Sequence, residues 1–325
     1  MYKLVYILAA SHSGSTLLSM LLNSHPDIVT TGELKLSSKA IGDINRYRCS
    51  CGQLINQCTF WQKIKEGMGR RGYDFDIANA GMDFNSVDSK YVHWLLGPLN
   101  RGVLLEALRD CALKISPKWR KHLPDIQKRN AALISTILET AGAKVVADSS
   151  KTDLRLKFLL RNPELDIKVI HLIRDGRGVA LTYMNPVEFA DAKTPDLRAG
   201  GMGGNRDNER LTIAQAANQW KRSNEAALNV IRRVDKSRKI EIHYEQLCRD
   251  TENTFVRLFQ FIGLDSDTRE REFRAAANHV IGNGMRLDKT SEINLDERWR
   301  SALTKDELQV FNQIAGALNR RFGYE

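Results

Sequence analysis

The sequence is poor in cysteine and has no long hydrophobic run, and each absence excludes a class of protein. Five cysteines among 325 residues do not suggest the disulfide scaffold of a small secreted domain. The first apolar run, from Lys3 to Ala10, is too short to span a membrane and lacks the layout of a signal peptide. We therefore expect a cytoplasmic protein without a membrane span.

Aromatic residues are also scarce, at 7% of the chain, while the formal net charge is +10 at pH 7. A basic surplus suits an anionic ligand, a nucleic acid or an acidic surface. A nucleic-acid-binding protein would gather its basic residues on one face, among aromatic side chains. Because the basic residues here are spread along the whole chain, we expect no nucleic-acid partner. A basic nucleic-acid-binding protein without catalysis stays as an alternative, and the oligomeric state is left open.

Strand patterns alternate with helix patterns, which predicts an α/β fold with a central parallel sheet flanked by helices. We interpret residues 1–325 as a single domain, with an insertion or substrate-facing subdomain at about 35–125 and a mobile loop at about 186–210. The strands are expected at 3–9, 144–147, 167–173 and 239–243, and the helices at 17–23, 126–141, 153–160, 176–183, 212–234, 251–262, 267–278 and 305–321.

A short loop joins the first strand to the first helix and has the composition of an anion site. A helix that follows such a loop presents free backbone N–H groups and the positive end of its dipole. Gly14 allows close approach, and Ser13, Ser15 and Thr16 offer hydroxyl groups. An ordinary strand–helix turn is the alternative. The loop is not a Walker A motif, because no Lys follows Gly14. A P-loop kinase-like phosphotransferase, which shares this layout, is the closest enzyme alternative.

A second anion site is indicated where a buried strand ends in Arg174. Ligands of open α/β sheets bind at the carboxyl ends of the strands. Thr182 lies eight residues later, about two turns into the next helix, and its hydroxyl group could reach the same phosphate as Arg174. In the alternative interpretation, Arg174 and Asp175 form a surface ion pair.

Taken together, five segments resemble the PAPS-dependent sulfotransferases of bacterial type, which are similar to tyrosylprotein and carbohydrate sulfotransferases. PAPS is 3′-phosphoadenosine 5′-phosphosulfate. The resemblance implies a P-loop-like three-layer fold of the sulfotransferase type, and it covers most of the chain. The segments are SHSGSTLL at 11–18 followed by HPD and Gly32-Glu33, DSSK at 148–151, RDGR at 174–177 with Thr182, HYEQL at 243–247, and HVIGNGMR at 279–286.

In this family a sulfuryl group moves from PAPS to a hydroxyl or amine by in-line displacement. The nucleotide product is PAP, which is 3′,5′-bisphosphoadenosine, and no metal is required. The resemblance implies that the first loop binds the 5′-phosphosulfate and that Arg174 and Thr182 bind the 3′-phosphate. Tyr244 would lie beside the nucleotide, and Asn283 and Arg286 would close over it. The first loop consists of Ser11, His12, Ser13, Gly14, Ser15 and Thr16.

The resemblance also implies the catalytic groups. Glu33 is the expected base, at the Gly-Glu position of the tyrosylprotein type, and Lys151 is the expected stabiliser of charge on the sulfuryl group. The alternatives are a capping or solvated Glu33 and a surface Lys151 at a helix start. His12 departs from the family, which has Lys or Arg there. It could stabilise the leaving oxygen or compete with Glu33 as the base.

The acceptor is not identified by the sequence. A saccharide, a lipid-linked sugar, a phenol or another small alcohol are all open, and a glycan ranks first by family analogy. The poorly patterned stretches at about 35–125 and 186–210 are expected to shape the acceptor pocket.

Cys49, Cys51 and Cys58 form a compact group of three thiols. Such a group could bind zinc with a fourth ligand. His93 or Cys111 could supply that ligand, although no spacing argues for either of them. Free or structural thiols are the alternative, and we assign no metal from the sequence.

Overall fold

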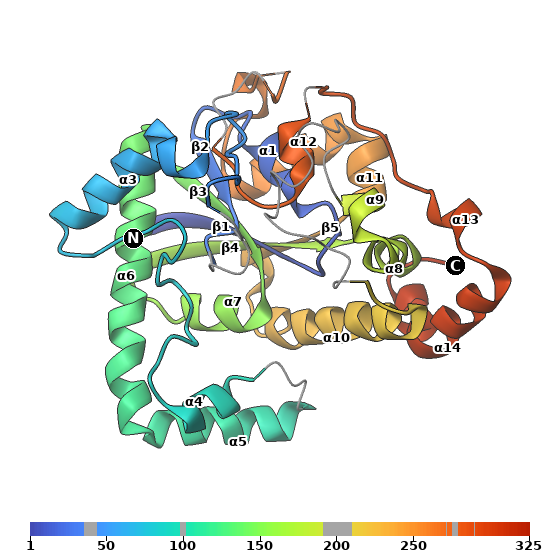
Figure 1. The fold of residues 1–325 in the computed structure, drawn as a ribbon, viewed down its shortest axis with the longest axis horizontal. Helices are drawn as coiled ribbons and strands as arrows, with labels where there is room; N and C mark the ends of the chain where they lie inside the picture. The colour runs from blue at the N-terminus through green and yellow to red at the C-terminus, as the bar shows by residue number, and fades with distance from the viewer. Residues whose placement is uncertain (36–43, 98–101, 191–209, 271, 275–278, 289) are drawn as a thin grey trace.

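The computed structural model describes residues 1–325 except 36–43, 98–101, 191–209, 271, 275–278 and 289 (Figure 1). Its centre is a five-stranded sheet in the order β2-β3-β1-β4-β5, in which every neighbouring pair is parallel. The predicted parallel sheet is thereby confirmed. The strands are β1 (Tyr2–Ala9), β2 (Ile28–Gly32), β3 (Val145–Lys151), β4 (Leu165–Ile173) and β5 (Lys239–His243).

Helices cover both faces of the sheet, because the strands are apolar on both sides. Along β1, Leu4, Tyr6 and Leu8 join one buried cluster, whereas Val5 and Ile7 join another. The helices α7 and α10 lie on the first side, and α1 and α12 lie on the opposite side (Figure 1). The helical bounds are α1 (Ser15–Leu22), α3 (Thr59–Arg70), α4 (Lys90–Leu95), α5 (Gly102–Ile115), α6 (Pro117–Ala141), α7 (Asp153–Leu159), α8 (Gly176–Met184), α9 (Pro186–Ala190), α10 (Ile213–Ile231), α11 (Tyr244–Arg249), α12 (Thr251–Ile262), α13 (Trp299–Ala302) and α14 (Lys305–Arg321), with 3-10 turns η1 (Ile55–Gln57), η4 (Lys236–Arg238), η5 (Ser266–Thr268) and η6 (Gly284–Leu287).

The two helices that begin with a capping box match the sequence prediction closely, whereas α6 begins at Pro117 and not at 126 as predicted. Thr212 caps α10 and Thr304 caps α14, each in a capping box with the residue three positions later. The strand β2 was missed, because its five residues include two threonines and no alternation. The prediction of a helix at 267–278 was wrong. Among the described residues of this range, the structure has only the end of the 3-10 turn η5. Within this stretch only Phe273 is a buried hydrophobic side chain among the described residues, so no apolar stripe holds a helix against the core.

The stretch at about 35–125 contributes to the main core. Buried side chains from its helices and loops, such as Trp61, Phe75 and Val92, belong to the same apolar cluster as Leu4 and Val146 of the sheet. Residues 191–209 of the loop expected at about 186–210 lie outside the described part of the chain. The first residues of that stretch, Pro186–Ala190, form the helix α9. No helix in the described part of the chain is long and apolar enough to cross a membrane.

Candidate active site

All five strands end at one edge of the sheet, and residues at or just beyond each end line the same cavity. This follows from the parallel topology, which brings every carboxyl end to one side. The cavity has a volume of about 840 Å³. The strands β1 to β5 contribute, in order, the loop with His12, then Glu33, Lys151, Arg174 and Tyr244.

The loop after β1 lines the cavity and leads into the N-terminus of α1. Gly14 is the N-cap of α1, with φ of 87°, and no side chain caps the helix. The first intrahelical hydrogen bond runs from the Leu18 amide to the Gly14 carbonyl over 3.0 Å, so the amides of the preceding turn have no partner within the helix. Only glycine fits at position 14, since an added Cβ would lie 2.5 Å from the Tyr244 ring. The helix dipole adds positive potential at this point.

Arg174 reaches the same loop from the neighbouring strand. Its Nη1 donates to the His12 carbonyl over 2.8 Å, and its guanidinium carbon lies 4.5 Å from the centroid of the Tyr244 ring. The Trp220 indole donates to the Arg174 carbonyl over 3.3 Å, which fixes the backbone. The Thr182 hydroxyl, which also borders the cavity, donates to the Gly178 carbonyl. The residues of the two predicted anion sites therefore line one cavity.

A carboxylate already pairs with Arg174. Asp296 accepts from Nη2 of Arg174 over 2.9 Å and from Nε of Arg298 over 2.8 Å. Burial alone would raise the pKa of Asp296. The hydrogen bond from Arg298 and the positive charge of Arg174 outweigh that effect and hold the pKa well below its usual range. Two guanidinium groups thus surround one anion at the cavity wall, and no local sequence pattern pointed to Asp296.

Glu33 and Lys151 form an ion pair across the ends of β2 and β3. Both side chains line the cavity, with 30% and 16% of their surface exposed. Lys151 has φ of 66° and His12 has φ of 63°, and they are the non-glycine residues with positive φ in the part of the chain that the structure describes. Such backbones cost about 1–3 kcal/mol each and tend to occur at functional sites.

A buried ion pair positions these two residues. Asp148 pairs with Arg155 over 3.1 Å, and it accepts hydrogen bonds from the backbone amides of Ser150 and Leu34. Ser150 precedes Lys151 and Leu34 follows Glu33, so one carboxylate fixes both loops. The DSSK segment contains Asp148, but the role of Asp148 depends on its contact with the Leu34 amide, 114 residues away in the sequence.

The segment that begins at His279 forms another wall of the cavity. Ile281 pairs with Gly32 at the end of β2, where a Cβ on Gly32 would lie 1.9 Å from the Ile281 carbonyl oxygen. Asn283 lines the cavity, as does Tyr244, which begins α11. Burial raises the pKa of Tyr244 well above its usual value, so the phenol keeps its proton and can donate a hydrogen bond.

Two predicted site residues do not line the cavity. Ser13, within the first loop, is buried, and its hydroxyl has no hydrogen-bond partner among the residues that the structure describes. Arg286 is also buried, and it donates to the carbonyls of Gly282 and Arg48. The other predicted residues all border the cavity: Ser11, His12, Gly14, Ser15, Thr16, Glu33, Lys151, Arg174, Thr182, Tyr244 and Asn283.

Comparisons with known proteins agree on one family. A family model described as "Sulfotransferase family" matches residues 100–268. Carbohydrate sulfotransferase 2 of mouse and that of human are each 26% identical over 196 residues, which cover 51% of this chain. The matched part is only 36% of the length of those relatives. A solved sulfotransferase domain from the curacin biosynthetic pathway is 17% identical and has a TM-score of 0.50, with 100% of this chain and 99% of that chain covered. That domain shares the fold.

Proposed function

The chain belongs to the sulfotransferase family, and from this membership we propose that it moves a sulfuryl group from PAPS to a hydroxyl of a carbohydrate. The observation that carries the proposal is the single cavity in which the N-terminus of α1 meets Arg174. PAPS has a phosphosulfate at one end and a phosphate at the other, so it needs two anion sites with room for adenosine between them. The volume of about 840 Å³ lies in the usual range for small-molecule pockets.

We assign the phosphosulfate to the first loop, where the amides at the start of α1 and the side chains of Ser15 and Thr16 are available. The 3′-phosphate goes to Arg174 and the Thr182 hydroxyl. Arg suits this role because its planar fork can contact two phosphate oxygens. Tyr244 supports the nucleotide between these sites, because its ring lies under Arg174 and against Gly14.

In the transfer step, the acceptor oxygen attacks sulfur while the bond from sulfur to the bridging oxygen breaks. The electron pair of that bond stays on the 5′-phosphate of the leaving bisphosphate. Glu33 takes the acceptor proton, and the Lys151 ammonium stabilises negative charge on the sulfuryl and bridging oxygens. Their ion pair supports these roles, since it keeps a carboxylate and a cation side by side at the cavity wall. This displacement needs no metal ion, because the Lys151 ammonium and the amides of α1 supply the positive charge.

The names of the relatives support a carbohydrate acceptor. The mouse and human relatives are both named carbohydrate sulfotransferases, and a sugar hydroxyl needs a general base in the position that we give to Glu33.

Replacing Arg174 tests the donor assignment. We expect Arg174→Ala to weaken the binding of PAP by about 10- to 150-fold, the equivalent of about 1.5–3 kcal/mol for charge-assisted hydrogen bonds. The measurement is calorimetric titration of the full chain with PAP. Arg177→Ala is the matched control, because Arg177 pairs with Asp175 and does not line the cavity. Equal PAP affinity in wild type and Arg174→Ala would remove Arg174 from the donor site.

Asp296 offers a test in the opposite direction. The Asp296 carboxylate accepts a hydrogen bond from Arg174 and would repel the phosphate, since both are negatively charged. Asp296→Asn should therefore tighten PAP binding by about 3- to 10-fold. Glu292→Gln is the control, since it removes the same charge from the same wall of the cavity. Weaker PAP binding in Asp296→Asn would mean that Asp296 positions Arg174 for the phosphate and does not compete with it.

A further inference from the structure

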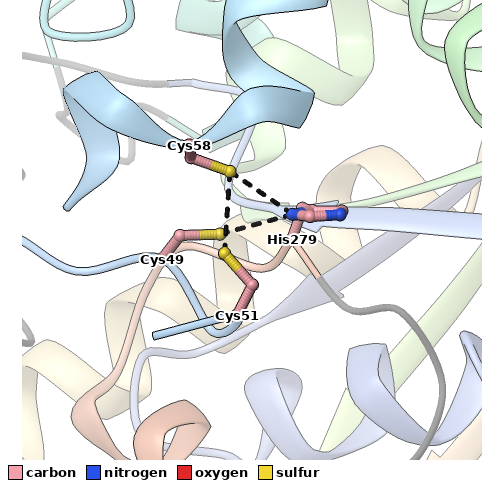
Figure 2. A group of neighbouring side chains, drawn as sticks. All are labelled: Cys49, Cys51, Cys58 and His279. Atoms are coloured by element: carbon pink, nitrogen blue, oxygen red, sulfur yellow. Dashed lines mark hydrogen bonds between the residues drawn. The ribbon is translucent and has the colours of Figure 1, made fainter. Parts of the chain in front are cut away.

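Three thiols and an imidazole meet away from the transfer site. Cys49, Cys51 and Cys58 come from the stretch between β2 and α3, and His279 comes from the segment after α12. Their side chains point toward one another (Figure 2). Cys49 and Cys58 are buried and His279 is half-buried, whereas Cys51 is exposed.

The distances between these groups match a tetrahedral metal site. The Cys51 and Cys58 sulfurs are 3.7 Å apart, and Nδ1 of His279 lies 3.4 Å from Cys58 and 3.7 Å from Cys49. All four ligand atoms lie within 4.8 Å of one another. A zinc ion with bonds of about 2.3 Å to sulfur and 2.0 Å to nitrogen would hold sulfurs about 3.8 Å apart, and sulfur and nitrogen about 3.5 Å apart.

We propose that Cys49, Cys51, Cys58 and His279 bind one structural zinc ion. A ligand set of three cysteines and one histidine is among those that close a zinc site completely. A disulfide does not explain the arrangement, because its sulfurs would be about 2.05 Å apart and would leave one thiol and the imidazole without a role. Soft thiolate ligands also favour zinc over magnesium or calcium.

The surroundings hold the ligands in place. The Phe60 ring stacks on the His279 imidazole, with centroids 4.4 Å apart and planes 1° apart. The Ser50 amide donates to the Val280 carbonyl over 3.2 Å, and the Val280 amide donates to the Ser50 hydroxyl over 2.8 Å. A turn closed by the Gly52 amide and the Cys49 carbonyl orients the first two thiols. These contacts hold the two segments that carry the four ligands in a fixed arrangement.

The zinc ion would fasten a wall of the active-site cavity. His279 lies three residues before Gly282, and a Cβ built on Gly282 would come within 3.6 Å of the Glu33 carboxylate. Arg286 links the same segment to the Arg48 carbonyl, next to the first cysteine. A closed four-ligand site leaves no position for substrate, so zinc acts on the structure and takes no part in the transfer step.

Metal analysis of the purified full chain tests the site. We expect one zinc per chain by inductively coupled plasma mass spectrometry. The protein is purified in reducing buffer without added metal, and any affinity tag is removed first. An excess of a thiol-reactive mercurial should release one equivalent of zinc per chain, measured by the absorbance of a zinc-binding dye. Cobalt should replace zinc and give the visible absorption bands of tetrahedral cobalt thiolate. Zinc well below one per chain, or stoichiometric iron in its place, would overturn the proposal.

Variants separate this site from other thiols. Cys58→Ser and His279→Ala should lose zinc and melt several degrees lower, because zinc binding contributes to folding. Cys111→Ser, at an exposed thiol outside the cluster, should keep one zinc per chain and the wild-type melting temperature. Full zinc content in both Cys58→Ser and His279→Ala would contradict the proposal. Should these variants fail to fold, the metal content of the wild type still decides.

Discussion

Replacing Glu33 by Gln should lower the rate of sulfuryl transfer by about 10²- to 10⁴-fold, the range for loss of a general base, while PAP binding stays within about twofold of wild type. Gln has the shape of Glu and keeps an acceptor oxygen for Lys151, so the ion-pair geometry at the cavity wall is preserved in part. What is lost is the ability to take a proton from the acceptor. The measurement is steady-state turnover with PAPS and a carbohydrate acceptor, beside calorimetry with PAP.

Two comparisons make the Glu33 result interpretable. Glu188→Gln removes a second carboxylate from the cavity lining and should leave most of the turnover. His12→Ala addresses the competing base, because His12 also lines the cavity and contacts Tyr183 edge-on at 4.7 Å. If Glu33→Gln keeps the wild-type rate and His12→Ala loses it, the base is His12 and our assignment is wrong.

The site residues that sequence reasoning located are those carried by local motifs. The first loop and Arg174 each follow a buried strand, and parallel strands bring such positions to one edge of the sheet. Glu33 could be named only through family resemblance, since β2 has no strand pattern of its own. Helices with capping boxes were also predictable, because the cap and the helix lie within a few residues of each other.

The residues that escaped prediction act through partners far away in the chain. Asp296 meets Arg174 across 122 residues, and His279 meets Cys49 across 230 residues. The three cysteines were visible in the sequence, but no spacing could point to His279 as the fourth ligand. Which side chains meet at such distances depends on how the C-terminal segment pairs with the end of β2, and no local pattern records that pairing.

Lys151 should be as sensitive as Glu33, for a different reason. We expect Lys151→Met to lower turnover by about 10²- to 10³-fold, the usual effect of losing one group that stabilises charge in the transition state. Lys151→Gly should lose activity to the same extent. Lys151→Arg keeps the charge and should retain part of the rate. Turnover is measured as for Glu33→Gln, and thermal or denaturant unfolding is measured for each variant.

The two inactive variants separate the charge from the backbone. Both remove the ion pair with Glu33, but only glycine adopts the φ of 66° without a steric cost. Lys151→Gly should therefore be more stable than Lys151→Met by about 1 kcal/mol. The irregular pairing at the end of β3, where the register with β1 shifts between Tyr6 and Leu8, supports a strained turn at this position.

The outcome distinguishes a functional lysine from an incidental one. If Lys151→Gly is inactive and yet the more stable of the two, the strained backbone serves to aim an ammonium group at the sulfuryl transfer, and the chain gives up stability to hold it there. If Lys151→Gly turns over at the wild-type rate, Lys151 is dispensable for the transfer, and the charge on the sulfuryl oxygens must be stabilised by the amides of α1 and by His12. A less stable Lys151→Gly would show that residue 151 is not strained, and the argument from its φ would no longer hold.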